Sequence, residues 1–230
     1  MAYEIYKPEQ KCRPIRGVLF DMDGLVLDSE ILYSRFWMEA CRFYGYPMTY
    51  EQSLTMRGLG SKAGEAMLHC YFGPNASYKQ LRAKRIELMD AFVEENGVGL
   101  KPGILELMSY LKVQGIAAAI TSSSPRERIV SHLSRHGLDT QFDRLCSGHE
   151  VANGKPAPDI YLYGAASLEL RPEECLALED APAGILSAHR AGCIPVMIPD
   201  QDQPSEETKA LLYAKADTLA DIIDLIEAAK

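Results

Sequence analysis

Short apolar runs alternate with amphipathic stretches along most of the chain, and this alternation predicts a parallel α/β sheet with helices on both faces. The expected strands are Gly17–Phe20, Ile116–Ile120, Arg144–Gly148, Cys175–Leu178 and Ile194–Ile198. The expected helices are Gly103–Gly115, Pro125–His136, Pro158–Leu168, Ala183–Ala191 and Ala216–Lys230. Pro195 in the last strand fits a sheet edge or a position near a strand start.

The segment 30–100 has a different pattern, because it is rich in aromatic, Met and charged residues and contains no β-branched run. Three or four amphipathic helices are expected there, and Gly45, Gly73 and Gly97 stand where helices end. We therefore expect an α-helical cap domain at 30–100, inserted after the first strand of a core domain formed by 1–29 and 101–230.

Composition narrows the class of protein further. The 230 residues carry a formal net charge of −8, which disfavours binding to nucleic acid or to an anionic membrane surface. The N-terminus lacks the apolar core of a signal peptide, and no apolar run approaches the ~20 residues that cross a bilayer. Six scattered cysteines without a CxxC pair favour reduced thiols. We expect a cytoplasmic protein that is a monomer or a weak homodimer.

Polar residues follow the predicted strands at the points where those strands end. They are Asp21 and Asp23, Ser122 and Ser123, Lys155, and Glu179 with Asp180. Ligands of an open parallel sheet bind beyond the carboxyl ends of its strands, so these side chains are expected at one rim. Asp21 and Asp23 are candidates for a nucleophile and a general acid/base, although a DxDG sequence is also an ordinary turn.

Glu179 and Asp180 are candidate Mg²⁺ ligands, because adjacent anions facing Asp21 are costly without a cation. The alternative is a solvated acidic turn. Lys155 is the candidate that offsets the charge of a bound phosphate, whereas most single lysines are surface charges.

Ser122 lies at a strand end, just before helix amides that would help to seat a phosphate. A ligand-free triple-serine turn remains the alternative. Ser124 with Glu127 matches a capping box, and Pro125 fits the first helical position, so we expect Ser124 to cap a helix.

Four motifs in this order resemble those of the haloacid dehalogenase-like phosphohydrolases, and in particular the branch of β-phosphoglucomutases and related phosphatases. The motifs are DMDGLVLDSE (21–30), the strand-end Ser122, GKPAPD (154–159) and LEDAPAG (178–184). The resemblance implies a Rossmann-like core with a helical cap. It also implies that Asp21 becomes phosphorylated and that Asp23 is the general acid/base.

The same resemblance implies a set of ligands. Mg²⁺ would be bound by the carboxylates of Asp21, Glu179 and Asp180 and by the main-chain carbonyl of Asp23. The transferring phosphoryl group would be bound by Ser122, Ser123, Lys155 and the main-chain amides of Met22 and Asp23.

The sequence departs from the mutases of this branch at two positions. Tyr33 stands where they carry a His, and Ser61 beside Lys62 stands where they carry an Arg that holds a second phosphate. We therefore predict a Mg²⁺-dependent phosphatase of a small phosphorylated metabolite such as a sugar phosphate. A sugar-phosphate mutase and a non-enzymatic phospho-acceptor module are the alternatives.

Four residues of the expected cap are candidates for substrate contact: Tyr33, Trp37, Arg57 and Lys62. The alternative for the two aromatic residues is the core of the cap, because they lie at helical spacing. The alternative for the two basic residues is a solvated loop.

Overall fold

The computed structural model describes residues 3–7, 14–56, 59, 61–200 and 203–229. The chain divides into two compact units. We call Met1–Leu27 with Gly99–Lys230 the sheet unit, and Asp28–Val98 the helical unit.

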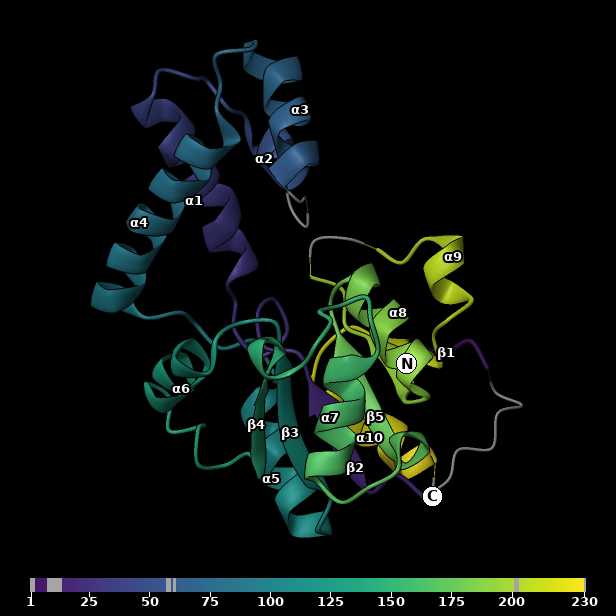
Figure 1. Cartoon of the computed structure of the whole chain (residues 1–230). Helices are drawn as coiled ribbons and strands as arrows, with labels where there is room; N and C mark the ends of the chain where they lie inside the picture. The colour runs from purple at the N-terminus through teal and green to yellow at the C-terminus, as the bar shows by residue number, and fades with distance from the viewer. Residues whose placement is uncertain (1–2, 8–13, 57–58, 60, 201–202, 230) are drawn as a thin grey trace. The chain divides into compact units, whose positions relative to one another are not determined.

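The sheet unit is built on a seven-stranded sheet with the order β1-β7-β6-β5-β2-β3-β4 (Figure 1). The strands are β1 Tyr3–Ile5, β2 Gly17–Phe20, β3 Ala117–Ser122, β4 Arg144–Ser147, β5 Cys175–Glu179, β6 Ile194–Met197 and β7 Ala214–Ala216. All neighbouring pairs are parallel except β1 with β7. The predicted parallel α/β fold is therefore confirmed.

Helices cover both faces of this sheet. They are α5 Ile104–Gln114, α6 Arg126–Ser134, α7 Asp159–Ser167, α8 Pro182–Ala191, α9 Glu206–Lys209 and α10 Asp221–Ala228, with 3₁₀ turns at Gly148–Glu150 and Pro172–Glu174. Leu19, Ala119 and Ala177 pack in one buried cluster with residues of α7 and α8. Because side chains alternate along a strand, Val18 and Phe20 face the opposite side, which is also buried.

Three parts of the sheet unit differ from the expectation. The predicted C-terminal helix began at Ala216, but this residue ends β7, and α10 begins only at Asp221. The strands β1 and β7 and the short helix α9 were not predicted. Pro195 is the second residue of β6, a strand with neighbours on both sides. Its carbonyl accepts a hydrogen bond from the Tyr213 amide at 2.9 Å, and β7 begins only at the next residue, Ala214.

The helical unit consists of α1 Glu30–Phe43, α2 Tyr50–Leu54, α3 Ser61–Phe72 and α4 Tyr78–Asn96 (Figure 1). Its own core is formed by Trp37, Cys41, Met48, Met56, Leu68, Ala76, Tyr78 and Leu81. The backbone of Gly97 after α4 has a φ of +75°, a conformation that glycine adopts easily, so it ends the helix as predicted. Among the described residues, no helix is both long and apolar enough to cross a membrane.

The chain leaves and re-enters the sheet unit at adjacent backbone positions. Leu27 and Leu100 form an antiparallel bridge, and the Lys101 amide donates to the Val26 carbonyl at 2.9 Å. The chain segments on either side of the insertion are therefore hydrogen-bonded to each other, and the insertion does not interrupt the sheet.

Candidate active site

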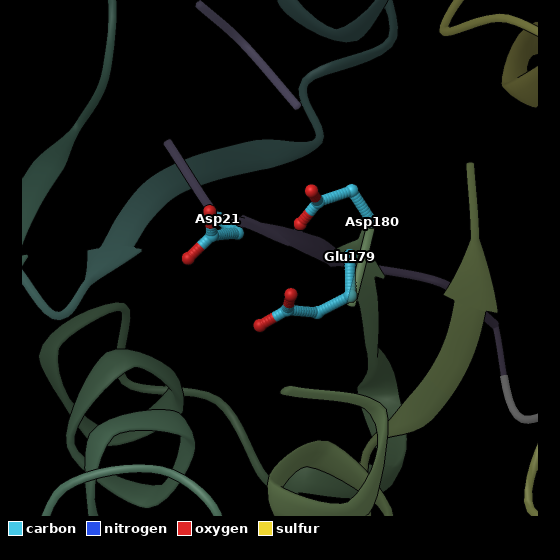
Figure 2. Close-up of side chains that lie close together, drawn as sticks. All are labelled: Asp21, Glu179 and Asp180. Atoms are coloured by element: carbon cyan, nitrogen blue, oxygen red, sulfur yellow. The ribbon is translucent and has the colours of Figure 1, made fainter. Parts of the chain in front are cut away.

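Three carboxylates gather at the carboxyl ends of β2 and β5. These strands are paired in parallel, and the Asp21 amide donates to the Leu178 carbonyl at 3.0 Å, which places Asp21 beside Glu179. One carboxylate oxygen each from Asp21, Glu179 and Asp180 lies within 4.8 Å of the others. Figure 2 shows the three side chains directed toward a common space. Asp21 is 8% exposed and Glu179 is 2% exposed.

Lys155 joins this cluster from the loop before α7. Its Nζ lies 2.5 Å from Asp21 Oδ1 and 2.6 Å from Glu179 Oε1, and it donates to the Thr121 carbonyl at 2.9 Å. The three acceptors match the three N–H donors of a lysine ammonium group. Lys155 is therefore a buried cation that links the ends of three strands.

The cluster carries more negative than positive charge. Burial and the neighbouring Glu179 raise the pKa of Asp21 to about 7, although Lys155 acts in the opposite direction. Burial alone would lower the pKa of Lys155, but Asp21 and Glu179 outweigh burial and raise it, so the lysine stays charged. One ammonium group is thus shared between two buried carboxylates, and Asp180 adds a third.

These residues fit a divalent cation. A buried surplus of negative charge is costly unless a counter-ion binds, and the donors on offer are carboxylate oxygens, which suit Mg²⁺. Asp21, Glu179 and Asp180 are the candidate ligands. When bound there, Mg²⁺ would neutralise the carboxylates and allow an anionic phosphoryl group to approach.

The Asp23 carboxylate is held by Ser124, which corrects the predicted role of that serine. Ser124 Oγ donates to Asp23 Oδ2 at 3.0 Å, and the N-cap residue of α6 is Pro125, without a side-chain capping bond. Asp23 Oδ1 is buried and has no hydrogen-bond partner among the residues described. One oxygen of Asp23 is therefore fixed, and the other remains available to a ligand.

The predicted phosphate-binding residues lie at the same edge of the sheet but differ in exposure. Ser122 ends β3, is 1% exposed, and its Oγ accepts a hydrogen bond from the Ser124 amide at 3.1 Å. Ser123 is exposed. The Met22 side chain is fully buried, so this residue can offer only its backbone to a ligand.

The candidate cap residues lie in the helical unit. Tyr33 and Trp37 line a cavity of about 300 Å³, together with Tyr78, Arg82 and Arg85. Trp37 is 4% exposed, and its ring lies 5.6 Å from that of Tyr78, so it belongs to the core of this unit. The Arg85 guanidinium lies 4.6 Å from the centre of the Tyr33 ring.

Of the two basic candidates of the cap, only Lys62 lies within the described residues, and it does not line this cavity. Lys62 is exposed in the first turn of α3. Arg57 lies outside the described residues.

Two further residues touch the acidic cluster and were not predicted. Tyr161 on α7 is fully buried, and its hydroxyl donates to Glu179 Oε1 at 2.5 Å. Gly184 on α8 approaches so closely that a Cβ atom there would lie 1.9 Å from the Glu179 carboxylate. The only sequence signal for Tyr161 was a hydroxyl group on the apolar face of a helix, which needs a partner when buried.

Known proteins with similar sequences and structures point to one family. Residues 18–198 match the model of the family described as haloacid dehalogenase-like hydrolase. Hexitol phosphatase A of Escherichia coli K12 is 34% identical over 178 residues, which cover 77% of this chain and 80% of that protein. A phosphorylated carbohydrates phosphatase of Thermotoga maritima is 29% identical over 182 residues, covering 77% and 82%.

A solved structure shows the same fold. A HAD family hydrolase from Deinococcus radiodurans, with bound phosphate and sodium, superposes with a TM-score of 0.81 at 23% identity. The superposition covers 94% of this chain and 96% of that one.

Proposed function

Because the chain belongs to the haloacid dehalogenase-like hydrolase family, we propose that it is a Mg²⁺-dependent phosphatase of a small phosphorylated metabolite. The observation that carries the proposal is the buried pair of Asp21 and Lys155 inside a cluster of three carboxylates. Two relatives named as phosphatases of hexitols and of phosphorylated carbohydrates support a sugar phosphate or a polyol phosphate as the substrate class.

We assign the chemical steps to Asp21 and Asp23. A carboxylate oxygen of Asp21 attacks phosphorus, and the bond between phosphorus and the alcohol oxygen breaks as the aspartyl-phosphate forms. Asp23 in its acid form gives its proton to the departing alcohol oxygen. The resulting Asp23 carboxylate then takes a proton from the water that attacks phosphorus, which releases phosphate and restores Asp21.

Lys155 and Ser122 are assigned to the phosphoryl oxygens. Lys155 already contacts Asp21, the proposed nucleophile. A phosphoryl oxygen therefore needs to replace only one of the three acceptors of Lys155. Ser122 offers its hydroxyl at the end of the neighbouring strand β3, and Ser123 and the Met22 amide are proposed to assist. These donors would stabilise the charge on the phosphoryl group in the transition state.

The helical unit is proposed to be the cap that selects the substrate. Its cavity combines the Tyr33 ring with the guanidinium groups of Arg82 and Arg85, a lining suited to a hydroxylated carbon skeleton. Lys62 and Arg57 are proposed to contact substrate as well. The five described cysteines are free thiols, which supports a reducing compartment such as the cytoplasm.

The proposal is tested by measuring phosphate release from a panel of sugar and polyol phosphates with Mg²⁺. Asp21→Asn is expected to lower kcat by at least about 10³-fold, because the amide cannot act as the nucleophile. Asp90→Asn is the matched control, since it makes the same chemical change at an exposed position of α4. Full phosphate release by Asp21→Asn would exclude Asp21 as the nucleophile.

The mutase alternative is tested with β-glucose 1-phosphate as the substrate. Tyr33 stands where the resembled mutases carry a His, and this departure favours hydrolysis. Both free phosphate and glucose 6-phosphate are measured. Formation of the isomer without phosphate release would show a mutase instead of a phosphatase.

A further inference from the structure

A tyrosine hydroxyl is buried against the acidic cluster and has no role in the chemical steps assigned above. Tyr161 is 0% exposed and lies in the first turn of α7, where its hydroxyl donates to Glu179 Oε1 at 2.5 Å. Lys155 Nζ lies 5.1 Å from the centre of the same ring. A carboxylate oxygen can only accept, so the Tyr161 hydroxyl is the donor in this contact.

The hydrogen bonds distinguish the two oxygens of Glu179. Oε1 accepts from Tyr161 and also from Lys155, at 2.5 and 2.6 Å. A carboxylate oxygen has about two lone-pair sites, so these donors occupy Oε1. Oε2 is therefore the oxygen of Glu179 left for a cation.

Tyr161 differs from Lys155 in what it can do during the reaction. Lys155 is shared among Asp21, Glu179 and the Thr121 carbonyl, and it must give up one of these acceptors to bind a phosphoryl oxygen. The Tyr161 hydroxyl has a single proton to donate, and that proton goes to Glu179. Glu179 therefore keeps one fixed donor when Lys155 turns toward the substrate.

We propose that Tyr161 is a positioning residue of the cation site, whose hydroxyl holds the Glu179 carboxylate so that Oε2 faces the divalent cation. This inference rests on the metal site of the proposed function. Removal of the hydroxyl leaves Lys155 as the remaining donor to Oε1, and the carboxylate can then rotate. The primary effect expected is weaker binding of the divalent cation, and any effect on phosphate release would follow from that weaker binding.

The test compares Tyr161→Phe with Tyr163→Phe in the full chain. Tyr163 lies two residues further along α7 and is 39% exposed, so its variant makes the same chemical change away from Glu179. Mg²⁺ binding is measured by calorimetry and Mn²⁺ binding by electron paramagnetic resonance, both without substrate. We expect about tenfold weaker binding in Tyr161→Phe, the size typical for loss of a partner of a metal ligand, and wild-type binding in Tyr163→Phe.

The outcomes separate this inference from the proposed function. Tight cation binding by the wild type with the same affinity in Tyr161→Phe would overturn the role of Tyr161 alone. Absence of cation binding by the wild type would overturn the metal site and the inference together. A lower melting temperature of Tyr161→Phe with unchanged cation affinity would show a structural role only.

A second measurement applies if Tyr161→Phe does not fold. 3-Fluorotyrosine placed at position 161 or at 163 keeps both the ring and the hydroxyl, and its ¹⁹F resonance reports on the surroundings. Addition of Mg²⁺ is expected to shift the resonance at 161 and to leave that at 163 in place. An unshifted resonance at 161 in the presence of bound Mg²⁺ would overturn the proposal.

Discussion

The Ser124 hydroxyl decides how the Asp23 carboxylate is held in the sheet unit. It donates to Asp23 Oδ2 at 3.0 Å, while Oδ1 is buried without a hydrogen-bond partner among the described residues. A typical hydrogen bond stabilises by about 0.5–1.5 kcal/mol, so this contact favours one orientation of the Asp23 side chain. Ser124 therefore orients the proposed general acid/base.

Ser124→Ala is expected to lower kcat by about tenfold and to leave KM nearly unchanged. The Asp23 carboxylate would lose its fixed orientation, while the residues that bind the phosphoryl group stay in place. The control is Ser131→Ala, an exposed serine on the helix that follows, α6. Equal kcat values for the two variants would contradict the proposed role of Ser124.

The raised pKa of Asp21 predicts that cation affinity depends on pH. A proton and Mg²⁺ compete for the same carboxylate, and in the cation-free protein its pKa is about 7. Mg²⁺ affinity is therefore expected to fall by up to about tenfold for each pH unit below 7. Calorimetric titrations at pH 6 and pH 8 measure the effect, and equal affinities at the two values would contradict it.

The same group affects the free energy of unfolding of the cation-free protein. The folded state binds the Asp21 proton more tightly than the unfolded chain does, because its pKa is raised from 3.8 to about 7. The stabilisation from this group is therefore full below about pH 4 and is lost as the pH rises through 7.

The residues of the site differ in how well they could be predicted from the sequence. Asp21 and Glu179 stand at the ends of short buried strands, and the parallel sheet alone brings strand ends together. Lys155 comes from the loop before α7, and its place between a glycine and a proline indicated only a position near that edge. The position of Ser124 before Pro125 fits a helix cap equally well, and only the distant Asp23 decides between the two roles. Tyr161 has the spacing of an apolar helix face, so its partner could not be identified before the fold was known.

At the scale of elements, the junction of β5 and α8 shapes the acidic cluster. Glu179 is the last residue of β5, and α8 begins at Pro182. A Cβ atom at Gly184 in the first turn of α8 would lie 1.9 Å from the Glu179 carboxylate. The helix can approach the strand this closely only because position 184 has no side chain.

Gly184→Ala is expected to displace the Glu179 carboxylate and to weaken Mg²⁺ binding by at least about tenfold. Alanine favours a helix over glycine by roughly 1 kcal/mol, so a loss of binding cannot come from weaker helix propensity. Gly99→Ala is the control, because its Cβ atom would meet nothing within 4 Å. Calorimetry measures both variants, and wild-type affinity in Gly184→Ala would contradict the expectation.

The elements that could not be predicted share one physical property. β1 and β7 have three residues each and pair antiparallel, Tyr3 with Ala216 and Ile5 with Ala214. Strands this short carry almost no periodicity. β1 depends on a partner at the other end of the chain, and β7 lies between that strand and β6. The longer elements were predictable because their apolar pattern is visible within a single window.

At the scale of the whole molecule, the candidate cation site and the candidate substrate cavity belong to different units of the chain. All the carboxylates of the candidate cation site belong to the sheet unit, and the cavity around Tyr33 and Arg85 belongs to the helical unit. The bridge between Leu27 and Leu100 holds the two ends of the insertion side by side. Antiparallel chain segments of this kind can be joined by a short turn.

Replacement of residues 28–98 by a short Gly-Ser linker is expected to leave a folded sheet unit. Its Mg²⁺ affinity should stay within about threefold of the wild type, because no candidate ligand is removed. Discrimination among phosphorylated substrates should be lost together with the cavity. Thermal unfolding, calorimetry and kcat/KM for two different substrates measure these outcomes, and a chain that no longer unfolds cooperatively would contradict them.

The scattered origin of the site residues has a consequence for folding kinetics. Asp21 directly follows β2 and Glu179 ends β5, two strands that are far apart in the sequence, so the two residues meet only after β2 and β5 have paired. Such distant pairings carry a large loop-closure entropy and form slowly, and we expect the cation site to be complete only after the transition state. A bound cation would therefore stabilise the native state without helping the chain to reach the transition state. Mg²⁺ is therefore expected to lower the unfolding rate and to leave the refolding rate unchanged.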